Sequence, residues 1–305
     1  MRCMKAFYKT SPNCKSCRGL KAQSAMEYLM TYGWAILIIA VVLAALFELG
    51  VFNPMTFAPK ASPGSCQVLR PEGAGTTDFI SLSGECNGEL PQYAAQFNGQ
   101  SSAIETSGIN SLSTSNYVTI SFWMDWSGAT STTPLGFGGS SCSSQALLWE
   151  QSSTCWGFNP CGVYSVYGIN AQPIIGRWVF VTAIYNTTMT NSRLFINGVQ
   201  QTLTQCAGSA SNLVISNSIL FGMGEWSGDF SGSIANVQVY NTALSSNDIK
   251  ALYQEGIGGA PIKIQNLVAW YPLNGNANDY SGNGNNGVPS GVTYTSNWYS
   301  GYSAP

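Results

Sequence analysis

The sequence predicts an all-β protein, a two-sheet sandwich that one apolar helix precedes near the N-terminus. Short apolar segments recur from residue 93 onward at intervals of about 8–12 residues, and Gly, Ser and Asn fill the turns between them. Only one later segment has convincing helical periodicity. With 305 residues, the chain is long enough to bury a sizeable core.

Three segments show the periodicities expected of strands in such a sandwich. Residues 117–126 alternate, and residues 233–240 alternate again, as strands with one face on the core do. Residues 177–185 are apolar on both faces, which is typical of a central strand. The side chains predicted to share one face of the first strand are Val118, Ile120, Phe122 and Met124.

Turn and cap residues predict one hairpin and one helix. The dipeptide Asn197-Gly198 favours a type I′ turn, so the residues on either side are expected to pair as a hairpin. Residues 244–256 have the pattern of a short helix, with Ser245 or Ser246 as its N-cap.

The order of these segments resembles that of the LamG-like family of concanavalin A-like jelly rolls, over about residues 93–255. The resemblance implies a sandwich that recognises glycans or proteins through loops at one end. The segments that carry it are AQFNGQ (95–100), VTISFWM (118–124), RWVFVTAIY (177–185), LFINGVQ (194–200), FSGSIANVQVYNTALS (230–245) and IKALY (249–253).

The C-terminal segment resembles the opening strands of the same family. Residues 266–288 (NLVAWYPLNGNANDYSGNGNNGV) correspond to a piece that comes before the FNG segment in that family. A separate second repeat is excluded, because 41 residues cannot bury a sandwich core alone. We therefore expect a circular permutation, in which 267–271 and 287–294 fold back and complete the sheets.

Charge divides the chain into two populations. The first 22 residues hold six basic and no acidic residues, whereas the rest of the chain carries a net charge of −8. Residues 32–47 between them form an apolar run, and the extended segment 28–52 is long enough to span a bilayer as a helix. The basic flank predicts a single-pass membrane protein with a cytoplasmic N-terminus and an extracellular C-terminal domain.

The junction before this run resembles the class III signal peptide of archaeal type IV pilin-like proteins, over about residues 18–47. The resemblance implies that a prepilin-type peptidase cuts between Ala22 and Gln23, which makes Glu27 the fifth residue of the mature chain. In pilin-like subunits, a glutamate at this position is thought to meet the N-terminal ammonium of a neighbour. Membrane lipid, and self-assembly through Glu27, are therefore the expected partners of this segment.

The predicted cleavage site also divides the cysteines into two groups. Three of the nine lie in the leader, and an even six remain in the predicted exported region, which favours disulfides. Six cysteines allow 15 pairings. Proximity favours one pair between Cys66 and Cys86 and another within the group Cys142, Cys155 and Cys161. The six candidates are Cys66, Cys86, Cys142, Cys155, Cys161 and Cys206.

Four regions follow from these boundaries. They are a cleaved leader (1–22), a transmembrane or pilin-like helix (23–52), a Pro- and Gly-rich stalk that contains cysteines (53–92), and the LamG-like sandwich (93–305), in which 265–305 supply the permuted strands.

Two further features are candidate sites. Asp279 lies in an Asn- and Gly-rich loop, and such loops can hold calcium in LamG-like relatives, with Asp229 as a second oxygen donor. The alternative is that the loop serves only as a turn. Asn186 begins an N-x-[ST] sequon in a predicted loop, which makes it a candidate glycosylation site.

Exposed aromatic rings offer a third candidate, a sugar-stacking platform, although Trp in a sandwich is more often part of the core or rim. The candidates lie near predicted loops and are Trp126, Trp149, Trp156, Trp226, Trp298 and Tyr299. No residue is assigned to a ligand-binding site from the sequence.

Composition argues against catalysis and against nucleic-acid binding. The chain has no histidine, which excludes Ser-His-Asp and Cys-His machinery, and it has no Glu-x-Asp-x-Glu pattern of the kind that jelly-roll hydrolases carry. Glu225 and Asp229 are four residues apart and flank a Gly, so they are not interpreted as such a pair of carboxylates at alternate positions of one strand. No basic run exists beyond the N-terminus, so nucleic acid is not an expected partner.

The sequence thus predicts a membrane-anchored surface protein that displays a glycan- or protein-binding module and performs no catalysis. The alternative is a pilin-like subunit of a surface filament, with the sandwich on its exterior.

Overall fold

The structure is a computed structural model, and it divides the chain into two compact units, 1–59 and 60–305. The residues that it describes are 32–45, 66–71, 77–82, 90–128, 132–138, 146–152, 155–160, 164–171, 174–222 and 228–305. The predicted cleavage site at Ala22 and Gln23, and the predicted assembly residue Glu27, lie outside these residues.

In the first unit, residues 32–45 are helical and every side chain along them is exposed. The exposed side chains include large apolar ones, such as Trp34, Ile36 and Val41. Within the described ranges, no helix combines the length and the apolar character needed to cross a membrane.

The described part of the second unit is dominated by two eight-stranded sheets. The disulfide-bearing sheet has the order β14 (Thr204–Ala207), β10 (Val166–Ile169), β9 (Cys155–Asn159), β8 (Ala146–Ser152), β7 (Leu135–Phe137), β15 (Ile219–Phe221), β4 (Ala103–Thr106), β19 (Val288–Ser290).

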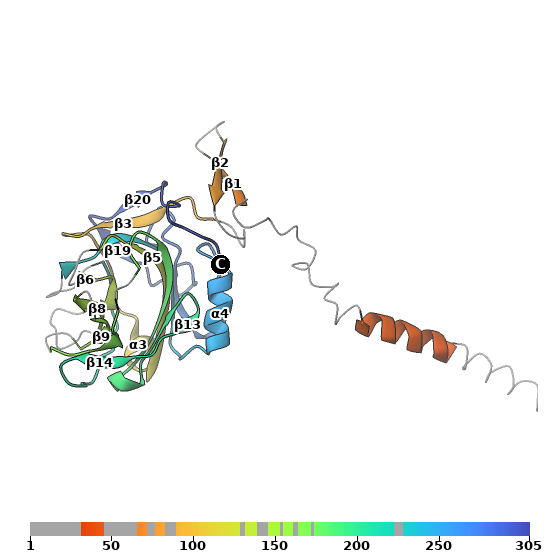
Figure 1. Cartoon of the computed structure of the whole chain (residues 1–305), viewed down its shortest axis with the longest axis horizontal. Helices are drawn as coiled ribbons and strands as arrows, with labels where there is room; N and C mark the ends of the chain where they lie inside the picture. Colours follow the sequence, from red (N-terminus) through yellow and green to blue (C-terminus); the bar gives the residue numbers. More distant parts are fainter. Residues whose placement is uncertain are drawn as a thin grey trace, which may run out of the picture. The chain divides into compact units, whose positions relative to one another are not determined.

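The helix-covered sheet lies opposite, and Figure 1 shows α4 (Ser246–Gln254) beside it. Its order is β13 (Val199–Gln200), β12 (Arg193–Ile196), β11 (Trp178–Asn186), β5 (Tyr117–Trp126), β17 (Ser231–Tyr240), β3 (Ala94–Asn98), β20 (Thr293–Thr295), and β18 (Leu267–Tyr271) pairs with β17. The remaining described elements are β1 (Cys66–Pro71), β2 (Thr77–Leu82), β6 (Thr132–Thr133), β16 (Gly228–Asp229), α3 (Asn110–Ser113), η2 (Met189–Asn191) and η3 (Ile264–Asn266).

The main core lies between the two sheets. Val118, Ile120, Phe122 and Met124 of β5 all belong to it, so the predicted inward face is confirmed. β5 is nevertheless buried on both faces, because Trp123 on its other side packs in a second cluster with Ile249 of α4. The sequence shows the alternation along β5 but not the helix that covers its outer face.

β11 confirms the prediction of a central strand. It lies between β12 and β5, and all nine of its residues are buried. The hairpin is also confirmed, since β12 and β13 pair across Asn197 and Gly198, whose φ angles are +49° and +76°. Positive φ at both central residues is what a type I′ turn requires.

The C-terminal segment joins both sheets. β18 pairs with β17 and β20 with β3 in the helix-covered sheet, while β19 pairs with β4 in the disulfide-bearing sheet. Beyond these strands, the Trp178 indole donates a 2.6 Å hydrogen bond to the Trp298 carbonyl, and the Trp298 indole donates to Pro91 at 3.0 Å. The end of the chain therefore closes against the start of the sandwich, as a permuted order requires, although a permutation itself stays a prediction.

Candidate functional site

The aromatic residues that the sequence suggested as an exposed platform are mostly internal. Trp126, Trp156 and Trp298 are at most 6% exposed, so they pack in the cores instead. Tyr299 is partly buried against the cluster that contains Trp298. The side chains of Trp149 and Trp226 lie outside the described residues. The core alternative, which the sequence left open, therefore holds for the tryptophans that can be placed.

Asp279 organises its own loop. Its Oδ1 accepts hydrogen bonds from the main-chain N–H groups of Trp270 (2.9 Å) and Ser281 (2.8 Å). Its Oδ2 accepts from the Ser281 hydroxyl and from the main-chain N–H of Asn285, both at 2.9 Å. Both oxygens are thus used within the protein, which fits the turn-forming role.

Asp229 is the second residue predicted as an oxygen donor for calcium. It lies in β16, which pairs in parallel with β6, and burial raises the pKa of its carboxyl. No cluster of three His, Cys, Asp or Glu side chains occurs among the described residues. Calcium takes about 6–8 oxygen ligands, among them backbone and Asn carbonyls, so calcium binding at Asp279 or Asp229 stays a prediction.

Asn186 is the last residue of β11 instead of a loop residue, which corrects the prediction of its position. Only 6% of it is exposed. Its Nδ2 donates to the carbonyl of Asn116 at 2.9 Å, and its Oδ1 accepts from the main-chain N–H of Thr188. In the folded domain, the amide that a glycan would modify is therefore already occupied.

One disulfide lies within the described residues and joins Cys155 of β9 to Cys206 of β14, with 5.9 Å between their Cα atoms. The two cysteines are 51 residues apart in the chain. Strand order, with only β10 between β9 and β14, brings the two cysteines together. Cys155 is therefore not part of the pair expected within the group Cys142, Cys155 and Cys161, and that pair stays a prediction for the other two. Cys86, Cys142 and Cys161 lie outside the described residues, as does the side chain of Cys66.

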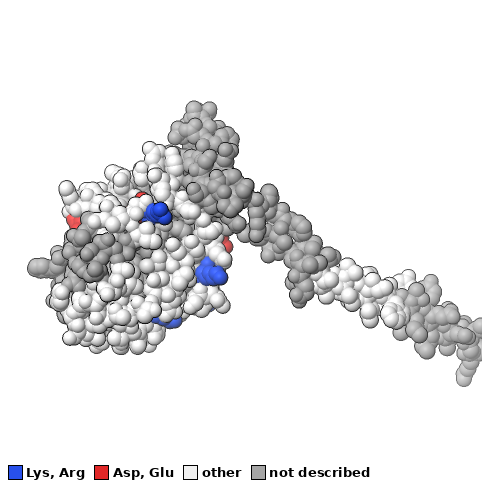
Figure 2. Space-filling view, viewed as in Figure 1, with Lys and Arg blue, Asp and Glu red and all other residues white. Residues whose placement is uncertain are grey.

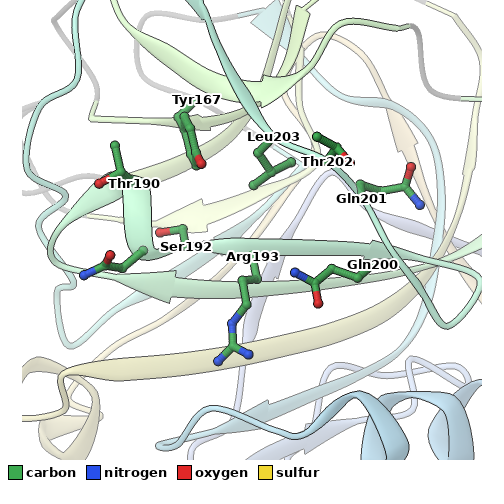
Figure 3. A pocket seen from close by; sticks show the side chains of 9 residues that line it. Tyr167, Thr190, Ser192, Arg193, Gln200, Gln201, Thr202 and Leu203 are labelled. Carbon is green, nitrogen blue, oxygen red and sulfur yellow. The ribbon is translucent and has the colours of Figure 1, made fainter.

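A cleft of about 520 Å³ opens where the edges of the two sheets approach each other. We call it the edge cleft, and its lining is Tyr167 together with residues 190–193 and 200–203. Tyr167 belongs to β10 of the disulfide-bearing sheet, whereas Arg193 and Gln200 belong to β12 and β13 of the helix-covered sheet. Figure 3 shows these side chains coming from separate ribbons.

The lining of the edge cleft is polar, and Arg193 is its one formal charge. Within the described residues, the Arg193 guanidinium and the Gln200 amide make no hydrogen bond or ion pair with the protein. Leu203 and Tyr167 are partly buried against the main core and supply an apolar floor. The cleft thus offers donors and acceptors to a ligand over an apolar base.

Charge is also sparse over the chain as a whole. Figure 2 shows only a few scattered charged side chains on the face it presents, and only 9% of the whole chain is charged. Arg193 is one of only six basic residues beyond the first 22. That scarcity was the one signal in the sequence for this site, because the lining comes from three separate segments that only the fold brings together.

Two antiparallel sheets that pack face to face around one core define a jelly-roll class of protein. Residues 98–250, just over half of the chain, match the family model of the concanavalin A-like lectin/glucanases superfamily. The chain belongs to this superfamily. No curated protein matches the chain.

Several solved structures are similar to the chain. A putative carbohydrate binding protein from Bacteroides ovatus is 15% identical with a TM-score of 0.48; the match covers 73% of this chain and 64% of that one, just under two thirds of its length. An SAP-like pentraxin from Limulus polyphemus is 12% identical with a TM-score of 0.45, and the match covers 68% of this chain and 95% of the pentraxin chain. The third structure is domain 4 of an extracellular GH43 arabinanase from Geobacillus stearothermophilus, in complex with arabinotriose. It is 19% identical with a TM-score of 0.37, and the match covers 65% of this chain and 90% of that domain. These likenesses do not bear on the ligand of this chain.

Proposed function

We propose that this protein is a cell-surface recognition protein that binds glycans in the edge cleft and performs no catalysis. The observation that carries the proposal is the set of uncommitted polar groups around Arg193 and Gln200, within a cleft of about 520 Å³. A glycan presents many hydroxyls, and a shaped cleft with a few well-placed polar groups is how proteins orient small ligands. The superfamily membership supports this choice of ligand class.

The proposal also includes a single-pass membrane anchor with the sandwich outside the cell. The exposed apolar side chains along 32–45 support it, because such a surface needs either lipid or a partner helix. The same helix supports the second candidate, a pilin-like filament subunit. Electron microscopy of sheared surface appendages, with mass spectrometry of their subunits, separates the two: the filament function requires this chain in the appendages, and the anchor function requires its absence from them.

A glycan array tests recognition. The full chain, kept in mild detergent, is compared with Arg193→Ala and with Lys250→Ala, which removes an exposed cation from α4 and is the matched control. We expect binding to a subset of glycans, a loss of about tenfold or more in Arg193→Ala, and no change in Lys250→Ala. Binding that ignores the Arg193 change would place the site elsewhere, and an array without any binding would contradict the recognition function.

A further inference from the structure

A second pocket, of about 290 Å³, lies on the helix-covered sheet and does not share a residue with the edge cleft. We call it the tail pocket, because the C-terminal segment supplies much of its wall. Its polar and aromatic lining residues are Asn236, Trp270, Asn274 and Tyr280. We propose that the tail pocket is a separate saccharide site that takes one neutral sugar ring. This proposal does not depend on what the edge cleft binds.

Trp270 is held rigidly in the pocket wall. Its main-chain N–H donates to Asp279, its carbonyl accepts from the Tyr280 N–H at 2.8 Å, and its indole Nε1 donates to Asn236 Oδ1 at 2.8 Å. The Tyr280 ring stands edge-on to the indole, with 6.3 Å between centroids. A preorganised aromatic wall binds a ligand without having to be ordered first.

The backbone around this wall is strained. Asn236 has a φ of +48° and lies where the pairing of β17 with β5 shifts register, between Ala235 and Gln238. Leu273, between two lining residues, has a φ of +57°. Left-handed conformations are uncommon for residues other than glycine and cluster where a ligand is held, and bulges re-aim side chains beside binding sites. At this register shift, the Asn236 Oδ1 accepts the hydrogen bond from the Trp270 indole.

The rim of the pocket keeps unused donors. Asn274 Oδ1 accepts from the Tyr93 N–H at 2.8 Å, but within the described residues its Nδ2 makes no hydrogen bond. The Tyr280 hydroxyl accepts from Asn276 at 3.2 Å, and no described group accepts its proton. Tyr280 as a whole residue is 54% exposed. Two donors therefore stand beside an accessible aromatic surface.

These features favour a neutral sugar. No lining residue carries a charge, so a charged ligand would lose its hydration without gaining a counter-ion. A sugar ring has an apolar C–H face, which suits the aromatic wall, and hydroxyls at its edge, which suit the Asn274 and Tyr280 donors. The volume of the pocket suits a single ring rather than a chain.

Saturation-transfer NMR on the full chain in detergent tests the proposal, with the methyl glycosides of glucose, galactose and mannose as probes and glucuronic acid as the charged comparison. We expect transfer to the ring C–H protons of at least one neutral probe in Arg193→Ala, the background used for every variant below because it removes the contribution of the edge cleft. Tyr280→Ala should weaken binding about tenfold or more, whereas Tyr280→Phe, which keeps the ring, should lose only part of it. Tyr164→Ala removes another exposed tyrosine and serves as the matched control.

A second variant distinguishes loss of sugar binding from loss of folding. Asn274→Asp keeps the oxygen that accepts from Tyr93 but removes the amide donor, so it should weaken sugar binding while the thermal unfolding midpoint is retained. Absence of transfer to every neutral probe would overturn the proposal, as would a signal that Tyr280→Ala leaves unchanged. Binding of a tetraproline peptide that depends on Tyr280, without any sugar signal, would reassign the pocket to a protein partner.

Discussion

Asp125 is a carboxylate that the fold places at the end of β5, between Trp178 of β11 and Ser233 of β17 in the register of the sheet. Its Oδ1 is buried and has no hydrogen-bond partner within the described residues. Burial raises the pKa of its carboxyl. Asp125 lines neither the edge cleft nor the tail pocket, so we expect its carboxyl to influence the stability of the fold and not ligand binding.

The pH dependence of that effect follows from the direction of the shift. Because the folded pKa lies above the unfolded one, the ionised carboxylate costs stability, and the cost grows as the pH rises from the unfolded to the folded pKa. We expect Asp125→Asn to raise the free energy of unfolding at pH 7 by about 0.5 kcal/mol, since solvent screens the exposed part of the group. Urea unfolding at pH 7 and pH 3 checks this; an equal gain at both values would contradict it.

Asn186 gives a second prediction at this scale. Because its amide is buried and bonded to Asn116, we expect peptides that contain Asn186 to be unmodified when the protein is expressed in a host that glycosylates sequons. Mass spectrometry of the purified chain checks this. Full occupancy would show that modification precedes folding of β11, or that the end of β11 opens.

At the scale of elements, α4 shows how local chemistry sets a boundary. Ser245 and Asp248 form a capping box, in which the Ser245 hydroxyl accepts from the Asp248 N–H and the Asp248 carboxylate accepts from the Ser245 N–H. Lys263 adds an ion pair to the same carboxylate at 2.8 Å. Burial opposes ionisation of Asp248, but the hydrogen bonds from Lys263 and Ser245 outweigh it and lower the pKa.

We therefore expect Asp248→Asn to cost about 0.5–1 kcal/mol at pH 7. The folded pKa lies below the unfolded one, so the stabilisation is complete above the unfolded pKa and is lost as the pH falls through the folded pKa. Unfolding curves of the two proteins should accordingly converge in acid. Lys250→Ala, on the same helix but outside the cap, is the control. A difference that persists unchanged at pH 2 would exclude the ionic part of this explanation.

At the scale of the whole molecule, the C-terminal segment completes both sheets. Without 265–305, β17, β3 and β4 would each lose a hydrogen-bonded neighbour. The cores would also lose Tyr271 and Trp298, both of which are buried. Unpaired edges and uncovered apolar surface together favour aggregation over folding.

Deletion of residues 265–305 should therefore abolish the cooperative unfolding transition of the sandwich. A chain that ends after Tyr302 keeps all three strands and should unfold almost as the full chain does. Circular dichroism during heating checks both. A cooperative transition in the longer deletion would show that the remaining strands fold without the tail, and it would refute the permuted arrangement.

Sequence reasoning succeeded where the interacting groups are close along the chain. The Asn197-Gly198 turn and the Ser245 cap each depend on a few consecutive residues, and the alternation of β5 depends on the chain's own geometry. These patterns, in family order, also led to the superfamily that the comparison establishes.

Only the tertiary structure decided which distant residues meet. It pairs Cys155 with Cys206 across 51 residues, and it assembles the edge cleft from the margins of two sheets. It also brings Asn236 to Trp270 in the tail pocket. The physical reason is that strand pairing and core packing fix these contacts, and a local residue pattern does not encode the order in which strands lie side by side.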